Sequence, residues 1–91
     1  MNIRARILVQ GRVQGVNFRH HTRLNALLHH VNGWVMNLPD GSVEGCLEGE
    51  EADVEALIEW CRSGPSWSEV DHVAVRHEEF RGEFDSFEIR R

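Results

Sequence analysis

The stretch GRVQGVNFR, residues 11–19, joins a strand-like segment to a helix-like one. Before it, Ile3 to Val9 alternates apolar and polar residues and then runs apolar, as a half-buried strand does. After it, no glycine or proline interrupts the chain from about Arg19 to His30, where apolar residues stand at helical spacing: Leu24, Leu27, Leu28 and Val31. The junction therefore predicts a strand followed directly by a helix.

Turn and helix signals divide the rest of the chain. Trp34 to Leu38 is strand-like, Pro39-Asp40-Gly41 is typical of a tight turn, and Ser42 to Glu48 predicts a returning strand. Acidic residues then precede a helical stripe that Gly64-Pro65 ends; its members are Val54, Leu57, Ile58 and Cys61. Two further strands are expected, one around Val70, Val73 and Val75 and a short one from Phe84 to Ile89.

This element order predicts an α+β fold. Two strand–helix–strand halves with right-handed crossovers give a ferredoxin-like βαββαβ sandwich. We expect an antiparallel sheet with two helices on one face, a short extra C-terminal strand, and a single domain over residues 1–91, since this length is too short for two cores.

The composition of the chain indicates where in the cell the protein is expected. No apolar run approaches the roughly 18 residues of a membrane span, and the first residues lack the apolar core of a secretory signal. A cytoplasmic protein without membrane contact is expected, in which Cys46 and Cys61 are packed thiols rather than a disulfide or a redox pair.

Charge is distributed unevenly along the chain. The net charge of −5 argues against nucleic acid as a partner, because phosphate-backbone affinity needs clustered cations. The first 37 residues nevertheless hold five arginines and no acidic residue, whereas all 15 acidic residues lie further on. This pattern fits either an acidic solvated surface or an anion site kept free of carboxylates. The chain contains no lysine, which excludes lysine-based covalent or phosphate-loop chemistry.

The segment at residues 11–19 could form an anion site. Glycines let a strand-to-helix loop curl so that its unpaired N–H groups converge, and the helix start adds partial positive charge. Arg19 would add a full charge and a planar fork that suits two phosphate oxygens. The alternative is that Gly11 and Gly15 only form a turn.

Asn37 is a second candidate because asparagine is disfavoured in strands. It could cap the turn that follows, or it could hold a water molecule as a neutral donor and acceptor.

The two segments together resemble the acylphosphatase family over essentially the whole chain. The family's first motif, G-x-V-Q-G-V-x-F/Y-R, is matched by Gly11, Val13, Gln14, Gly15, Val16, Phe18 and Arg19. Its second motif is matched in GWVMNLPDGSVEGCLEG by Gly33, Trp34, Val35, Asn37, Gly41, Val43 and Gly49. The family commonly has glycine where Asn17 stands, and asparagine is the next best residue if that position needs a positive φ.

The resemblance implies hydrolysis of a small-molecule acyl phosphate to a carboxylate and inorganic phosphate, without a metal or another cofactor. It implies that the backbone of Gln14, Gly15, Val16, Asn17, Phe18 and Arg19 wraps the phosphoryl oxygens. Arg19 would neutralise the phosphoryl group and Asn37 would orient the attacking water. We expect the enzyme to act as a monomer.

The sequence is also compatible with other functions. The same loop could serve a noncatalytic module that binds phosphorylated small molecules, and a ferredoxin-like RNA-binding domain would need a basic sheet face that this chain lacks. The histidine pairs at residues 20–21 and 29–30 lack the spacing of helical metal ligands, so we expect them to be solvated or to face a helix dipole. His21 could instead support the phosphate loop.

Overall fold

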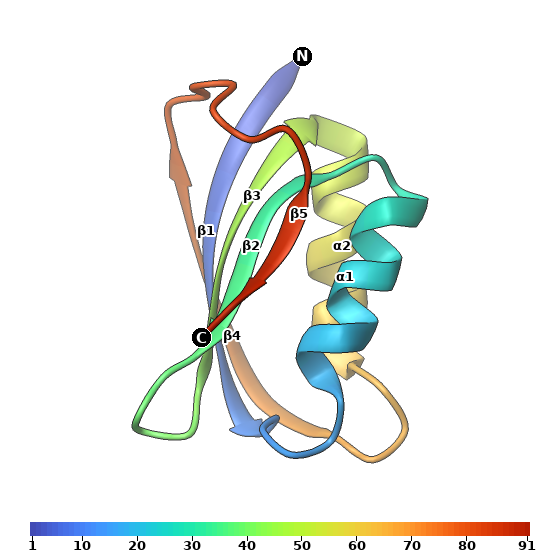
Figure 1. Cartoon of the computed structure of the whole chain (residues 1–91), viewed down its shortest axis with the longest axis vertical. Coiled ribbons are helices and arrows are strands. Elements are labelled where there is room, and N and C mark those ends of the chain that lie inside the picture. The colour runs from blue at the N-terminus through green and yellow to red at the C-terminus, as the bar shows by residue number, and fades with distance from the viewer.

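Two helices cover one face of a five-stranded sheet in the computed structural model, which describes residues 1–91 (Figure 1). The elements follow the order β-α-β-β-α-β with an added strand: β1 (Asn2–Arg12), α1 (Phe18–Leu28), β2 (Asn32–Asn37), β3 (Val43–Glu50), α2 (Glu51–Ser63), β4 (Glu69–Glu78) and β5 (Phe87–Arg90). The predicted ferredoxin-like α+β class is confirmed.

The sheet is mixed because of its last strand. The strand order is β4-β1-β3-β2-β5, and β1 to β4 pair antiparallel as predicted, whereas β5 pairs parallel with β2. The chain reverses after β4 and crosses the end of the sheet, so it returns in the direction of β2 and can pair with it only in parallel. The guanidinium of Arg90 lies 4.8 Å from the ring centroid of Trp34 and helps to fasten β5 to its neighbour.

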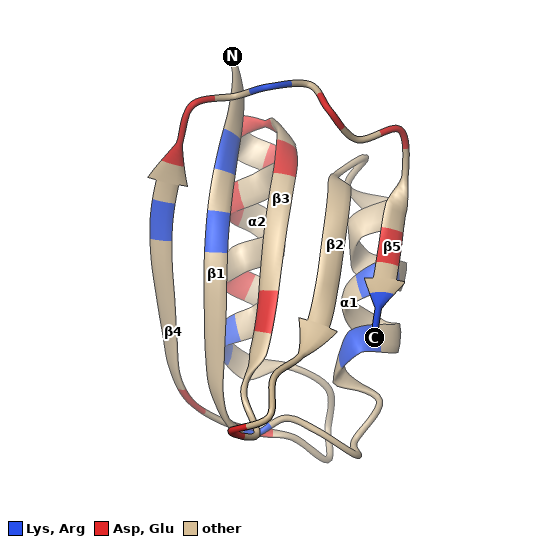
Figure 2. Cartoon of the chain, turned by 60° about the vertical axis from the view of Figure 1, so that its left-hand side comes forward, with Lys and Arg blue, Asp and Glu red and all other residues tan.

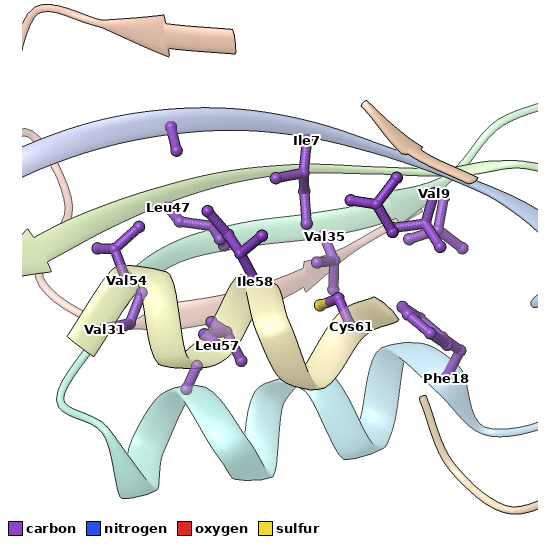
Figure 3. Packing of buried hydrophobic residues seen from close by; sticks show 14 of the residues in the cluster. Ile7, Val9, Phe18, Val31, Val35, Leu47, Val54, Leu57, Ile58 and Cys61 are labelled. Carbon is purple, nitrogen blue, oxygen red and sulfur yellow. The ribbon is translucent and has the colours of Figure 1, made fainter. Parts of the chain in front are cut away.

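The main core lies between the sheet and the helices (Figure 3). Strand residues that point toward the helices alternate with residues that point away, which gives the core members Ala5, Ile7 and Val9 on β1. The stripe predicted on α2 is confirmed, since all four of its residues are buried: Val54, Leu57, Ile58 and Cys61.

Helix α1 faces the core with a different stripe from the one its leucines suggested. Its buried residues are Phe18, Thr22 and Ala26, at i, i+4 and i+8, and the helix begins at Phe18. Three leucines on the outer side are 46, 50 and 71% exposed: Leu24, Leu27 and Leu28. Thr22 and Ala26 are small enough to let the helix lie close to the sheet, and the Thr22 hydroxyl donates to the Phe18 carbonyl within the helix.

Both cysteines are free and buried, as predicted. Burial raises the pKa of the Cys61 thiol to about 12, and burial also raises the pKa of Cys46. Both groups therefore stay protonated near neutral pH and are poor nucleophiles.

A buried ion pair fixes the segment that leads into β5. Arg4 and Glu48 lie opposite each other on β1 and β3, at 4 and 3% exposure, with Nη1 3.3 Å from Oε2. Figure 2 shows the arginines of β1 beside the glutamates of β3. The Glu48 carboxylate also accepts the backbone N–H groups of Arg81 at 2.9 Å, Gly82 at 3.2 Å and Glu83 at 3.1 Å. The carboxylate thus anchors the crossing between β4 and β5.

Removal of this carboxylate is expected to destabilise the fold strongly. Glu48→Ala removes the most deeply buried of the three carboxylates around Arg4, which keeps Glu78 and Glu83. It also leaves the backbone N–H groups of residues 81–83 without their acceptor, and each buried donor left unsatisfied costs about 1–3 kcal/mol. The free energy of unfolding from urea titration measures the loss. Glu50→Ala, which removes an exposed carboxylate two residues away, is the control and is expected to change little. Equal effects of the two substitutions would contradict the assignment.

Neither α1 nor α2 combines the length and the apolar character that crossing a lipid bilayer would require.

Candidate active site

A pocket of about 210 Å³ opens at the end of the sheet where β1 leads into α1. The β1–α1 loop and the β2–β3 turn lie at this same end of the molecule (Figure 1). The lining comes from the loop, the start of α1, the end of β2 and the C-terminal strand: Val13, Gln14, Gly15, Asn17, Phe18, Arg19, His20, Asn37, Ile89 and Arg91.

The glycines at the end of β1 and in the loop that follows are needed for different structural reasons. At Gly11 a β-carbon would collide with the Glu69 carbonyl oxygen, so glycine allows β1 to lie close to β4 where the register shifts. Gly15 has φ +74° and open space around it, so its conformation alone explains the glycine. Asn17 is also left-handed, with φ 61° and ψ 26°, which confirms that this position needs a positive φ.

The backbone amides of this loop lack acceptors within the protein. None of the backbone hydrogen bonds outside helices and strands is donated by residues 13–17, and the first amides of a helix have no partner inside it. No side chain caps α1 and no acidic residue stands in its first turn. A curled loop of free donors ahead of an uncapped helix start is a favourable place for an anion.

Arg19 stands in the first turn of α1 and is free to bind an anion. Its only hydrogen bond is a long one, from Nη1 to the Arg90 carbonyl at 3.4 Å, and it forms no salt bridge. Figure 2 shows that α1 carries basic residues and no acidic ones, in contrast to α2. Two arginines line the pocket, Arg19 and Arg91, and no Asp or Glu does.

Asn37 contributes a buried acceptor to the same pocket. It is the last residue of β2, and its Oδ1 is buried without a hydrogen-bond partner. Leaving such a group unsatisfied costs about 1–3 kcal/mol, so this acceptor favours a bound donor such as water.

Gln14 links the loop to the β2–β3 turn. Its Nε2 donates to the Leu38 carbonyl at 2.8 Å and to the Ser42 carbonyl at 3.0 Å. The side chain therefore joins the loop that leads to Arg19 and the turn that follows Asn37.

The structure brings most of the expected site residues together. Those that line the pocket are Gln14, Gly15, Asn17, Phe18, Arg19 and Asn37, whereas the side chain of Val16 packs against the core. Of the first histidine pair, His20 lines the pocket and His21 does not. The sequence did not assign four further lining residues to the site: Val13, His20, Ile89 and Arg91. The last two reach the pocket only because β5 pairs with β2.

No three His, Cys, Asp or Glu side chains gather anywhere in the structure as metal ligands would. The histidines of the first pair contact each other, with ring centroids 5.5 Å apart.

The fold and the pocket define a small α+β protein whose strand-to-helix loop presents free backbone amides beside an arginine. A family model described as Acylphosphatase matches residues 5–89. The chain belongs to the acylphosphatase family.

Individual relatives agree with this assignment over the full length of the chain. A protein of Geobacter metallireducens named Acylphosphatase is 58% identical over 90 residues, which cover 99% of this chain and 97% of that protein. The crystal structure of acylphosphatase from Bacillus subtilis has a TM-score of 0.94 and 34% identity, covering 98% of this chain and 99% of that one. HypF of T. kodakarensis contains the same fold, at a TM-score of 0.85 and 32% identity, over 12% of its own chain.

Proposed function

We propose that the free amides of the β1–α1 loop and the guanidinium of Arg19 bind the phosphoryl group of an acyl phosphate, while Asn37 orients the attacking water. Membership of the acylphosphatase family makes this chain an enzyme that hydrolyses acyl phosphates to a carboxylate and inorganic phosphate. The observation that supports these roles best is that one pocket holds unpaired loop amides, an arginine without a carboxylate partner and a buried unpaired asparagine oxygen.

The loop amides and Arg19 stabilise the negative charge of the phosphoryl group. A protein catalyses phosphoryl transfer mainly by positioning the reacting groups and by stabilising charge on the phosphoryl oxygens. Fixed N–H donors and a guanidinium supply this stabilisation without rearranging during the reaction, and removing one such donor typically costs about 3–4 kcal/mol of barrier stabilisation. No Asp or Glu side chain lines the pocket, so none repels the anion.

Asn37 orients the water molecule that acts as the nucleophile. Its Oδ1 accepts one hydrogen of the water and holds the water oxygen toward phosphorus. A bond then forms between the water oxygen and phosphorus, and the bond from phosphorus to the acyl oxygen breaks. The carboxylate leaves with the electron pair and needs no proton. The proton of the attacking water passes to a phosphoryl oxygen of the substrate, so no protein base is required.

We propose further that the enzyme works as a monomer in the cytoplasm. The residues proposed to act, Arg19 and Asn37, line the same pocket of the chain, and its two cysteines are free thiols.

Turnover of acetyl phosphate tests the proposal, with a phosphate monoester as the matched poor substrate. A good leaving group is essential because no protein acid protonates the leaving group in the proposed step, so the anhydride is expected to be hydrolysed and the monoester hardly at all. A chelator is expected to leave the rate unchanged. Equal turnover of both substrates, or loss of activity with the chelator, would contradict the proposed mechanism.

A further inference from the structure

The carboxamide of Gln14 has no donor left for a ligand, although the residue lines the pocket. An amide nitrogen carries two hydrogens, and those of Gln14 Nε2 are directed to the carbonyls of Leu38 and Ser42. The remaining oxygen is an acceptor, which cannot bind an anionic phosphoryl group. The side chain is thus committed to the protein, and only its backbone is free to contact substrate.

The two carbonyls belong to a turn that is already rigid. Leu38 donates to Ser42 at 2.8 Å across the turn, and the Ser42 N–H donates to the Asp40 carboxylate at 3.0 Å. The turn therefore moves as a unit, and Asn37 directly precedes its first residue. Whatever fixes the turn also fixes the end of β2 that carries Asn37.

The sheet itself does not join this turn to the phosphate loop. The pairing of β1 with β3 ends at Val9 and Val43, and beyond it β1 pairs only with β4. No backbone hydrogen bond links residues 13–17 to residues 38–42. Gln14 supplies the two hydrogen bonds that bridge this gap.

We infer that Gln14 is a positioning residue, which holds Asn37 and its water at the correct distance from the phosphoryl group bound in the loop. This inference rests on the proposed roles of the loop and of Asn37. A misplacement of about 1 Å in a reacting group can cost 100-fold in rate. Loss of the bridge therefore lowers kcat, while the loop amides and Arg19 still bind phosphate.

The test uses Gln14→Met, which keeps the length of the side chain and removes both donors. We expect kcat for acetyl phosphate to fall about 10- to 100-fold, while the inhibition constant of inorganic phosphate changes less than about twofold. Gln14→Asn keeps the amide but shortens it by one methylene, so it is expected to behave in the same way and serves if the first variant folds poorly. Asn25→Ala, which removes a side-chain amide bonded to its own helix at 2.9 Å, is the control and is expected to leave both constants unchanged.

The decisive readout is a double-mutant cycle with Asn37. If Gln14 acts through Asn37, then Gln14→Met lowers kcat in the native background and has little further effect in Asn37→Ala. Additive losses, or a loss of phosphate affinity that matches the loss of kcat, would overturn the inference. An unchanged kcat in Asn37→Ala alone would instead refute the water-orienting role on which the inference rests, so the two failures are distinguishable.

Discussion

Arg19→Ala is expected to reduce kcat/KM for acetyl phosphate by about 10³-fold or more, the scale on which an arginine acts in phosphoryl transfer. The guanidinium is the only charged group of the α1 N-terminus that lines the pocket, and no carboxylate of the protein competes for it. Its removal takes away the full positive charge that stands next to the loop amides, so the affinity for inorganic phosphate is expected to fall as well. Steady-state kinetics and phosphate inhibition measure both effects.

Arg23→Ala is the matched control for this experiment. Arg23 lies one turn further along α1, carries the same charge and donates to the Phe87 carbonyl at 3.2 Å, away from the pocket. We expect it to retain nearly full activity. A similar loss in the two variants would mean that Arg19 contributes only general positive charge.

Asn37→Ala is expected to lower kcat by about 100-fold or more, as misplacement of a reacting group does. Unlike Arg19→Ala, it is expected to leave phosphate inhibition nearly unchanged, because Asn37 contacts the water and not the phosphoryl group. The variant is also expected to fold normally, since the buried Oδ1 that it removes has no hydrogen-bond partner in the protein.

Asn32→Ala provides the control at the other end of β2. Its side-chain amide donates to the Phe84 carbonyl at 3.2 Å, so the substitution removes the same chemical group far from the pocket. We expect kcat to be maintained. Wild-type kcat in Asn37→Ala would refute the role of Asn37.

The sequence predicted those elements whose signals are local. The turn at residues 39–41 and the stripe of α2 could be located because turn residues and an apolar period act over a few positions. The same periodicity predicted the wrong face of α1. The leucines lie on one face of the helix, and the set Phe18, Thr22 and Ala26 lies on another that has the same helical spacing. The choice between them depends on how closely the helix approaches the sheet, which no local pattern contains.

Long-range features could not be predicted for the same reason. Charged residues such as Arg4 and Glu48 are typical of a solvated strand face, yet the crossing before β5 buries them. Arg19 and Asn37 could be proposed from motif resemblance, whereas the bridging role of Gln14 depends on carbonyls 24 and 28 residues away. Ile89 and Arg91 reach the pocket only through the pairing of β5.

The most direct test of the phosphate-binding loop is a titration with inorganic phosphate followed by the amide resonances of the labelled protein. Binding is expected to produce saturable shifts concentrated in residues 14–20 and in the side chain of Asn37, and Arg19→Ala is expected to weaken it. Saturable shifts at another surface, with the amides of residues 14–20 unperturbed, would contradict the account.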